Sequence, residues 1–372
     1  MRLATPAIIL AAIASIFSLP LASAAGSPPA RGEQFVPFTS FSTFRKAPGL
    51  EPGQVIWTSP KIQTRIYWNE LIASWNADLP TNTWLKVEVR AFYPDHATKF
   101  YAMGLWSAAP SDHPSESIKH QKDADGNVLT DTLVLNQTAD GLQVRVTLQN
   151  QSRRKPRLKF LGLSLLNTNE TFNTLPPNRA AWDRMIPVPE RSQMAYENGD
   201  KLCSPTTVSM LLAYWSQKLN RPQLDHDVPE VERGVFDPNW PGTGNWAFNM
   251  AYAGSFRGLR AYVTRMSDVS EIEDWIAQGI PVGLSVCYNR LRGKSRVPSG
   301  HIVVCCGFTK TGDPVINDPG TSHNVRKVFP RANLIDAWSY SLKTVYLVYP
   351  ANARLPHDRF GHWDSSTARR FK

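Results

Sequence analysis

Alternating apolar and polar positions dominate the first half of the chain. The alternation has a period of two in residues 84–90, 130–135 and 142–148, which is typical of strands with one buried face. Turn-forming residues separate such runs from about residue 53 to residue 172. The pattern predicts an antiparallel β-sandwich domain over residues 53–172. Residues 25–52 are rich in Gly, Pro and Ser and are expected to form an extended lead-in.

The second half of the chain contains patterns typical of both helices and strands. Proline-rich residues 173–187 predict a linker. Apolar residues spaced three or four apart in residues 204–217 predict a helix that begins at Cys203. Pro205 falls in its first turn, where the missing N–H costs nothing. A second helix is expected at residues 269–278, before a Gly-Ile-Pro stop.

Nearly continuous apolar runs follow, as expected of strands buried on both faces. They lie at residues 281–288, 301–308, 314–317 and 342–349. A helix followed by strands predicts an α+β domain over residues 188–350. Residues 351–372 are polar and basic and are expected to form a peripheral tail.

The first 24 residues have the layout of an export signal. Arg2 is followed by an apolar stretch from residue 7 to residue 19 and by small residues at 22–24. The apolar run is short for a membrane anchor, which needs about 20 residues. We therefore expect cleavage after Ala24, no membrane span after cleavage, and a secreted or periplasmic protein.

The charge of the chain is strongly basic, with a formal net charge of +10. A basic surface attracts anionic polymers, but no nucleic-acid-binding motif accompanies it. We therefore expect no nucleic-acid partner. No His-x-x-x-His spacing is present, and the adjacent Cys305 and Cys306 would point to opposite faces of a strand. No metal site and no cofactor are predicted.

Cys203 differs from the other cysteines in its surroundings. Cys287, Cys305 and Cys306 lie within apolar runs, where a cysteine behaves as a small buried hydrophobic residue. Cys203 instead follows a polar segment and starts a predicted helix, where unpaired backbone N–H groups favour a thiolate. His301 begins a predicted strand, a position from which it can reach both a nucleophile and a substrate. The pair predicts a nucleophile and its base.

Two further residues are candidates for the same site. If residues 309–313 form a turn, Cys305 pairs with Asp318, and His301 shares a face with Asp318. Four residues of strand span about 13 Å, so a bulge or a shifted register must bring carboxylate and imidazole together. Asp318 is the candidate for orienting His301. Gln193 and the backbone N–H of Cys203 are the candidates for an oxyanion hole.

The order of these motifs resembles the C39-like cysteine peptidase domain over about residues 185–350. The matching segments are VPERSQ (188–193), CSPTT (203–207), GIPV (279–282), GHIVV (300–304) and NDP (317–319). The resemblance implies a papain-like fold with a Cys203, His301 and Asp318 triad, and with Gln193 at the oxyanion hole. Ser204 departs from the family, in which glycine commonly follows the cysteine.

The expected activity is that of an exported cysteine peptidase or amidase with a peptide or protein substrate. Hydrolysis and transfer to a second amine share the acyl-enzyme step, so both remain open. The alternative is a non-catalytic binding protein that keeps the papain-like scaffold. In that case the tryptophans of the β domain would stack on a glycan or another cell-surface polymer. These tryptophans are Trp57, Trp68, Trp75, Trp84 and Trp106.

Overall fold

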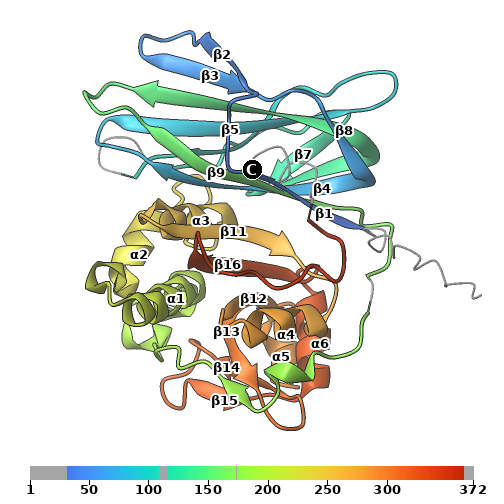
Figure 1. Ribbon diagram of the computed structural model, residues 1–372, viewed down its shortest axis with the longest axis vertical. Helices are drawn as coiled ribbons and strands as arrows, with labels where there is room; N and C mark the ends of the chain where they lie inside the picture. Colours follow the sequence, from blue (N-terminus) through green and yellow to red (C-terminus); the bar gives the residue numbers. More distant parts are fainter. Residues whose placement is uncertain (1–31, 109–114, 173, 364–372) are drawn as a thin grey trace, which may run out of the picture.

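The computed structural model describes residues 32–108, 115–172 and 174–363. It has a β-rich N-terminal part and a C-terminal part of mixed helices and strands (Figure 1), so the predicted α+β class is confirmed. The expected signal peptide, residues 1–24, lies outside the described residues. Within those ranges, no helix is long and apolar enough to cross a membrane.

The N-terminal part is a single nine-stranded antiparallel sheet. Its strands are β1 (Glu33–Phe38), β2 (Arg45–Pro48), β3 (Gln54–Thr58), β4 (Ile62–Asp78), β5 (Thr83–Phe92), β6 (Tyr101–Trp106), β7 (Gly126–Leu129), β8 (Thr132–Asn150) and β9 (Arg157–Leu166). The long strand β8 pairs with β4 in its first half and with β5 in its second. The expected β-sandwich is therefore a single continuous sheet, in which β8 is hydrogen-bonded to both β4 and β5.

Part of the expected lead-in belongs to this sheet, which corrects the sequence prediction for residues 33–48. Strand β1 pairs along its length with β9, and Phe35 and Phe38 are buried. Pro37 lies within β1, and it is tolerated because β1 is an edge strand that pairs with β9 alone along the sheet order. The turn-rich composition of this segment concealed the strand.

The C-terminal part is a seven-stranded sheet with helices packed against it. Its strands are β10 (Arg184–Met185), β11 (Leu259–Arg265), β12 (Val282–Cys287), β13 (Gly300–Phe308), β14 (Pro314–Asn317), β15 (Arg326–Val328) and β16 (Thr344–Pro350). Its α-helices are α1 (Cys203–Leu219), α2 (Val228–Val235), α3 (Trp246–Ser255), α4 (Val269–Ala277), α5 (Tyr288–Leu291) and α6 (Arg331–Ser339). Short 3₁₀ turns lie at Arg179–Ala181, Gln193–Ala195, Gly199–Lys201 and Pro222–Leu224.

Helix α1 is the central helix of this part and is buried from Ser204 to Ser216. It approaches the sheet closely at Gly283, where an added Cβ would lie 3.3 Å from Thr207 and 2.9 Å from Tyr346. The Thr207 hydroxyl donates to the carbonyl of Ile302 on β13 at 3.1 Å. These contacts hold the start of α1 beside the start of β13, where Cys203 and His301 lie.

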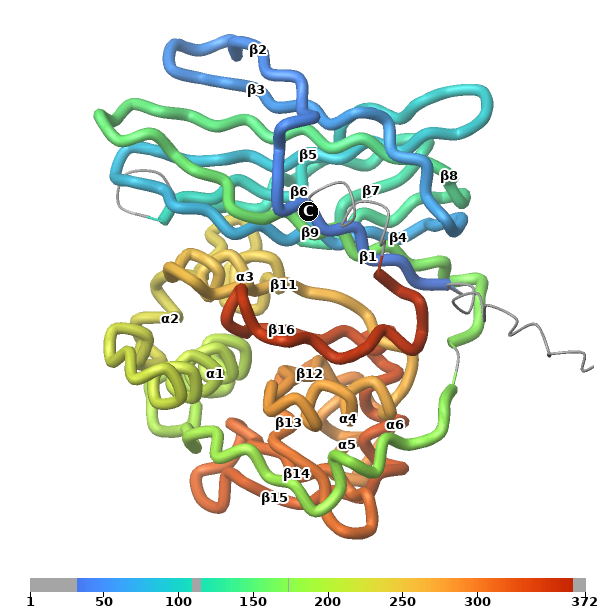
Figure 2. The backbone as a smooth tube through the Cα atoms, in the orientation of Figure 1, coloured from blue at the N-terminus to red at the C-terminus, as the bar shows by residue number. Residues whose placement is uncertain are grey.

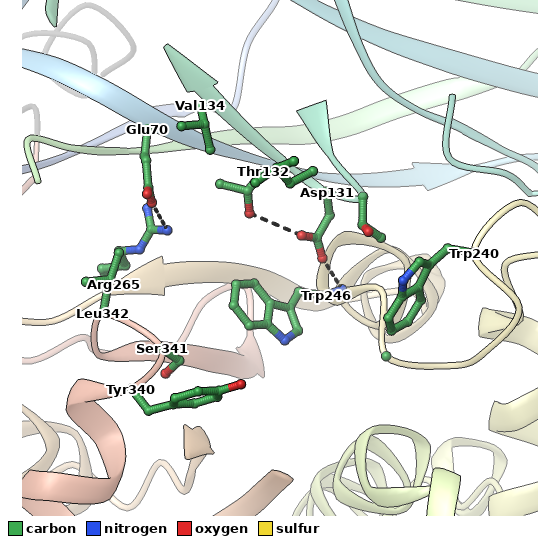
Figure 3. Close-up of a pocket in the computed structure, with 13 residues that line it drawn as sticks. Glu70, Asp131, Thr132, Val134, Trp240, Trp246, Arg265, Tyr340, Ser341 and Leu342 are labelled. Carbon is green, nitrogen blue, oxygen red and sulfur yellow. Dashed lines mark hydrogen bonds and ion pairs between the residues drawn. The ribbon is translucent and has the colours of Figure 1, made fainter. Parts of the chain in front are cut away.

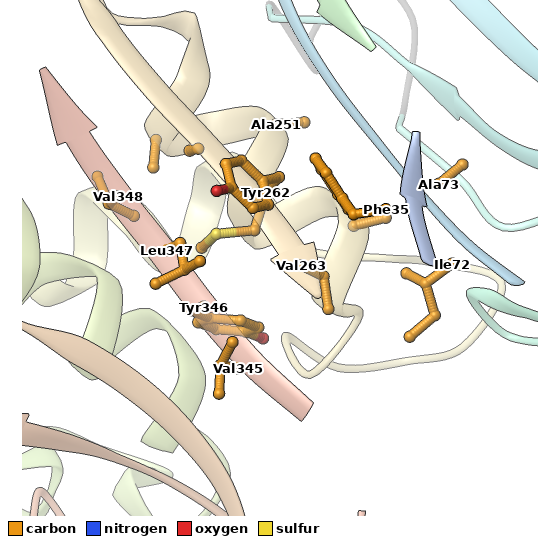
Figure 4. Close-up of a cluster of buried hydrophobic side chains, with 14 of the residues drawn as sticks. Phe35, Ile72, Ala73, Ala251, Tyr262, Val263, Val345, Tyr346, Leu347 and Val348 are labelled. Atoms are coloured by element: carbon orange, nitrogen blue, oxygen red, sulfur yellow. The ribbon is translucent and has the colours of Figure 1, made fainter. Parts of the chain in front are cut away.

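The two parts of the molecule share one hydrophobic core. Phe35 of β1 faces Tyr262 of β11 across the junction (Figure 4), and their ring centroids are 4.6 Å apart. Ile72 of β4 belongs to the same cluster. Side chains of β4 also satisfy the free edge of β11. Asn76 exchanges two hydrogen bonds with the backbone of Ala261, at 2.7 and 3.1 Å. The N-terminal sheet is therefore a packed partner of the C-terminal part.

Most of the tryptophans expected to bind a glycan are part of the packed interior. Trp68 and Trp75 have no exposed surface, and Trp106 is 1% exposed. A sugar cannot stack on these rings without opening the core. Trp57 and Trp84 are partly buried, so of the five they are the two that are not fully part of the interior.

The C-terminal segment packs at the junction at residues 360–363, which corrects the expectation of a peripheral tail for this stretch, whereas residues 351–358 are exposed or half-buried. Figure 2 shows it leaving β16 and returning to β1. The backbone N–H of Phe35 donates to the carbonyl of His362 at 2.8 Å, and the Trp363 ring centroid lies 4.9 Å from that of Phe35. The segment thus ties β1 to the C-terminal part.

His362 forms a charged contact where this segment packs against β1 and the C-terminal part. It is 3% exposed and lies between Glu271, with Nδ1 at 3.2 Å from Oε1, and Glu33, with Nε2 at 3.5 Å from Oε2. Burial disfavours the charged ring, but the two carboxylates outweigh it and raise the pKa of His362 to about 10. The charge of His362 therefore stabilises the fold below its unfolded pKa of about 6.5, and this stabilisation is lost as the pH rises through about 10.

Replacing His362 by alanine is expected to lower the free energy of unfolding by about 3–5 kcal/mol at pH 6, because two buried carboxylates lose their partner. The difference from wild type should shrink toward pH 10, where the wild-type imidazole is also losing its proton. Thermal unfolding at the two pH values measures this. His357→Ala, in the same segment but exposed, is the matched control. An equal loss of stability at both pH values would contradict the assignment of a charged His362.

Candidate active site

Three elements far apart in sequence place Cys203, His301 and Asp318 together. Cys203 is the first residue of α1, His301 is the second residue of β13, and Asp318 directly follows β14. His301 and Asp318 are buried, whereas Cys203 is half-buried. His301 Nε2 lies 2.9 Å from Asp318 Oδ1.

The pairing of β13 with β14 differs from the sequence prediction and explains this short distance. Cys305 is opposite Ile316, whereas the sequence placed it opposite Asp318. The register shifts between Cys305 and Gly307, as at a β-bulge. Asn317 is opposite Val304, so the following Asp318 lies two residues closer to His301 than expected. The bulge that the spacing required is therefore present, and it closes the gap to His301.

The thiol of Cys203 lies where an anion is stabilised. No side chain caps the N-terminus of α1, so its first N–H groups and the positive end of the helix dipole face the sulfur. Burial opposes ionisation of the thiol. The hydrogen bond and charge of His301 outweigh burial, and the N–H groups of Ile302 and Ser204 add to them. Together these contacts hold the pKa of Cys203 below its ordinary value.

His301 is held in the charged form by its two partners. Burial favours the neutral ring, but the hydrogen bonds to Asp318 and Cys203 outweigh it and raise the pKa of His301 to about 9. Burial likewise opposes ionisation of Asp318, and the bond from His301 reverses this, so the pKa of Asp318 is lowered. Since Nε2 bonds Asp318, Nδ1 is the ring nitrogen left for the thiol. Both shifts favour the thiolate form of Cys203 and the imidazolium form of His301.

Tyr288 is a residue of this site that the sequence reasoning missed. It directly follows β12, and nothing in its spacing marks it. Its hydroxyl donates to Asp318 Oδ2 at 2.9 Å, and its ring centroid lies 4.1 Å from that of His301. The N–H of Gly320 donates to Asp318 Oδ1 at 3.0 Å. These bonds fix the carboxylate so that it in turn fixes the imidazole.

Tyr288→Phe is expected to reduce kcat/KM by about tenfold, because the variant keeps the ring and loses one hydrogen bond to a charged group. Asp318 then interacts more strongly with His301, so the fall of activity at alkaline pH should move to higher pH. The pH dependence of kcat/KM is the measurement. Tyr67→Phe, on an exposed tyrosine, is the control. A rate and a pH profile that both stay unchanged would make Tyr288 a packing residue only.

Gln193 lies beside the site rather than at its surface. Its backbone N–H donates to the carbonyl of Pro319 at 3.0 Å, which ties it to the loop after Asp318. Its side chain is buried, with Nε2 donating to the carbonyl of Gly199 at 2.6 Å and Oε1 without a partner among the described residues. One N–H of the amide remains for another acceptor. Gln193 does not line the cavity at Cys203.

An open cavity gives Cys203 and His301 access to a substrate. Its volume is about 390 Å³, and Trp240, Trp246 and Tyr340 form its aromatic walls. The segments that contain Trp240 and Tyr340 show no apolar periodicity, so the sequence did not indicate that these residues line the site. The site thus combines an activated thiol, a charged imidazole and space for a bound chain.

The remaining cysteines and potential metal ligands show no comparable arrangement. Cys287, Cys305 and Cys306 are buried free thiols, and burial raises the pKa of Cys306 to about 12. Among the described residues, no group of three His, Cys, Asp or Glu side chains could hold a metal ion. Cys203 is therefore the one of the four thiols that lies beside a histidine on the wall of a cavity.

Comparisons with known proteins agree with the motifs and the geometry. Residues 53–165 match the model of the Peptidase C39 N-terminal domain, and residues 185–345 match that of the Peptidase C39-like family. No curated protein sequence matches the chain. The crystal structure of a candidate C39-like peptidase from Bacillus anthracis is similar, with 16% identity and a TM-score of 0.36. The match covers 45% of this chain and 98% of that one. The chain therefore contains a C39-like peptidase domain over residues 185–345, preceded by a Peptidase C39 N-terminal domain.

Proposed function

We propose that this protein is an exported cysteine peptidase or amidase that cleaves a peptide or related amide bond through Cys203, His301 and Asp318. The observation that carries the proposal is the contact of the Cys203 thiol with His301 on the wall of an open cavity, with Asp318 2.9 Å behind the imidazole. The C39-like family supports peptidase or amidase chemistry. The signal-like residues 1–24 support export, and the N-terminus of the exported protein is then expected to be Ala25.

The reaction follows from the charges of the pair. The Cys203 thiolate attacks the carbonyl carbon, and the backbone N–H of Cys203 binds the oxyanion. Gln193, the predicted second donor, would have to turn its buried amide toward the cavity to reach the oxyanion. His301 gives its proton to the leaving amine, so the C–N bond breaks and a thioester remains. Water then attacks the thioester while His301 takes a proton from it. The acid product leaves, and thiolate and imidazolium are restored. A second amine in place of water would give transfer.

The test is hydrolysis of a synthetic peptide library by residues 25–372, followed by mass spectrometry of the products. Cleavage that disappears after alkylation of Cys203 is the expected result. Library peptides left intact under conditions in which Cys203 also fails to react with a thiol probe would overturn the proposal. The protein would then be the non-catalytic binding protein that keeps the scaffold.

A further inference from the structure

A second cavity adjoins the one that contains Cys203. It has a volume of about 380 Å³ and lies between the N-terminal sheet and the C-terminal part, as Figure 3 shows. Trp240, Gly244, Trp246 and Tyr340 line both cavities. The two cavities therefore adjoin at these residues, and we refer to both together as the groove. We call the second cavity the junction cavity and define it by Glu70, Asp131, Trp240, Trp246, Arg265 and Tyr340.

Two aromatic side chains of the shared wall are unusually exposed. Trp240 is 46% exposed and Tyr340 is 42% exposed, although both are large apolar rings. Rings that face a groove beside a nucleophile offer their faces to a bound chain, and a ring face attracts a cation. The wall between the two cavities is therefore suited to a long side chain that ends in a positive charge.

The far end of the junction cavity carries more negative than positive charge. Glu70 Oε2 lies 2.5 Å from Nη2 of the buried Arg265. Asp131 adds a second carboxylate, whose Oδ2 accepts from the N–H of Trp246 at 2.6 Å. The charged residues that line the junction cavity are thus two carboxylates and one guanidinium, with a formal sum of −1. Such a charge favours a cationic group of the substrate.

The competing occupant is a substrate carboxylate bound by Arg265. Nε and Nη1 of Arg265 have no hydrogen-bond partner among the described residues. Both nitrogens are buried, and Glu70 already bonds Nη2, so a substrate carboxylate in the cavity does not reach the guanidinium. The charge balance thus selects the cation.

The backbone around the junction cavity is strained at two points. Thr130 and Leu342 line it and have φ values of 62° and 52°, in the left-handed region that such side chains rarely adopt. Strain of this kind is retained where the surrounding structure needs it, and it concentrates at binding sites. Thr130 belongs to the β7–β8 turn, so the N-terminal sheet contributes a shaped wall of the groove.

We propose that the junction cavity is a substrate subsite that binds a lysine or arginine side chain next to the scissile bond, so that the N-terminal sheet helps to select the substrate. The inference rests on the proposed peptidase or amidase function and names its substrate class. The cation contacts the Trp240 and Tyr340 rings and the carboxylates at the far end. The backbone on either side of it extends toward Cys203.

The experiment measures binding without cleavage. Fluorescent acetylated and amidated hexapeptide pools, each with lysine, arginine, norleucine or glutamate fixed at a central position, are titrated against the Cys203→Ala protein by fluorescence anisotropy. The lysine and arginine pools are expected to bind about fivefold more tightly than norleucine, and glutamate most weakly. Trp240→Ala in the same background should remove the preference. Phe236→Ala is the control, because Phe236 is 47% exposed and lines neither cavity.

Glu70→Gln provides a second variant, since it removes one carboxylate and should also abolish the preference for lysine. Equal binding of all pools, no binding of any pool, or tighter binding of glutamate would overturn the inference. An equal effect of Trp240→Ala and Phe236→Ala would do so as well. If the unaltered protein hydrolyses peptides without a preference for basic residues, the proposed subsite is wrong and the proposed peptidase function stands. If basic peptides bind preferentially but no peptide is hydrolysed and Cys203 is unreactive, the proposed peptidase function is wrong and the groove is a binding site only.

Discussion

Replacing Cys203 by alanine is expected to reduce peptide hydrolysis by about 10⁴-fold or more, because no other group can form the acyl intermediate. The substitution removes the sulfur that contacts His301 and the N–H groups of Ile302 and Ser204. Since Cys203 is half-buried at the start of α1, the fold should be retained. Initial rates of peptide cleavage and a thermal unfolding curve measure the two effects.

The matched control for this variant is Cys305→Ala. Cys305 is a buried free thiol on β13, four residues from His301, and burial raises its pKa. Its replacement should lower stability slightly and leave the rate per folded molecule unchanged. If Cys203→Ala kept more than a small fraction of the activity, or if Cys305→Ala lost as much, Cys203 would not be the nucleophile.

Asp318→Asn is expected to lower kcat/KM by about 10²- to 10⁴-fold and to change its pH dependence. The carboxylate accepts from His301 Nε2 at 2.9 Å and is one of the groups that raise the pKa of His301 to about 9. A neutral amide removes this charge, so the pKa of His301 falls. The active ion pair then loses its imidazolium proton at lower pH. The alkaline limb of the profile should move from near 9 toward neutral pH.

Asp313→Asn is the control, because Asp313 lies in the turn at the opposite end of β14, where it accepts from the backbone N–H of Arg331 at 2.9 Å. The control should keep both the rate and the position of the alkaline limb. A large loss of rate in Asp318→Asn with an alkaline limb that stays near 9 would show that another group sets the charge of His301.

The elements that carry the site were predictable because their signals are local. Helix α1 begins at Cys203, as predicted from apolar spacing and from Pro205 in the first turn. Strand β14 has the predicted bounds, and β13 differs from the prediction by one residue. The order of short motifs then identified the C39-like domain, which the family match confirms.

The features that the sequence did not reveal depend on contacts between distant segments. The shift of register between Cys305 and Gly307 arises where β13 pairs with β14, and no local pattern locates it. His362 is buried where it pairs with Glu33 of β1 and Glu271 of α4, which come from the two parts of the molecule. Tyr288 gains its role from a hydroxyl that reaches Asp318, thirty positions along the chain. Composition and periodicity do not carry such information.

The central claim is that Cys203 is a thiolate at neutral pH, and the rate of its alkylation by iodoacetamide as a function of pH tests it most directly. Peptide mapping of the labelled protein reports Cys203 separately from the buried thiols. We expect labelling at pH 7 that is faster than that of a model thiol, with an apparent pKa below the ordinary value, and loss of this advantage in His301→Ala. Labelling of Cys203 that is no faster than that of the model thiol, with the pH dependence of an ordinary cysteine, would show that Cys203 is not a thiolate at neutral pH.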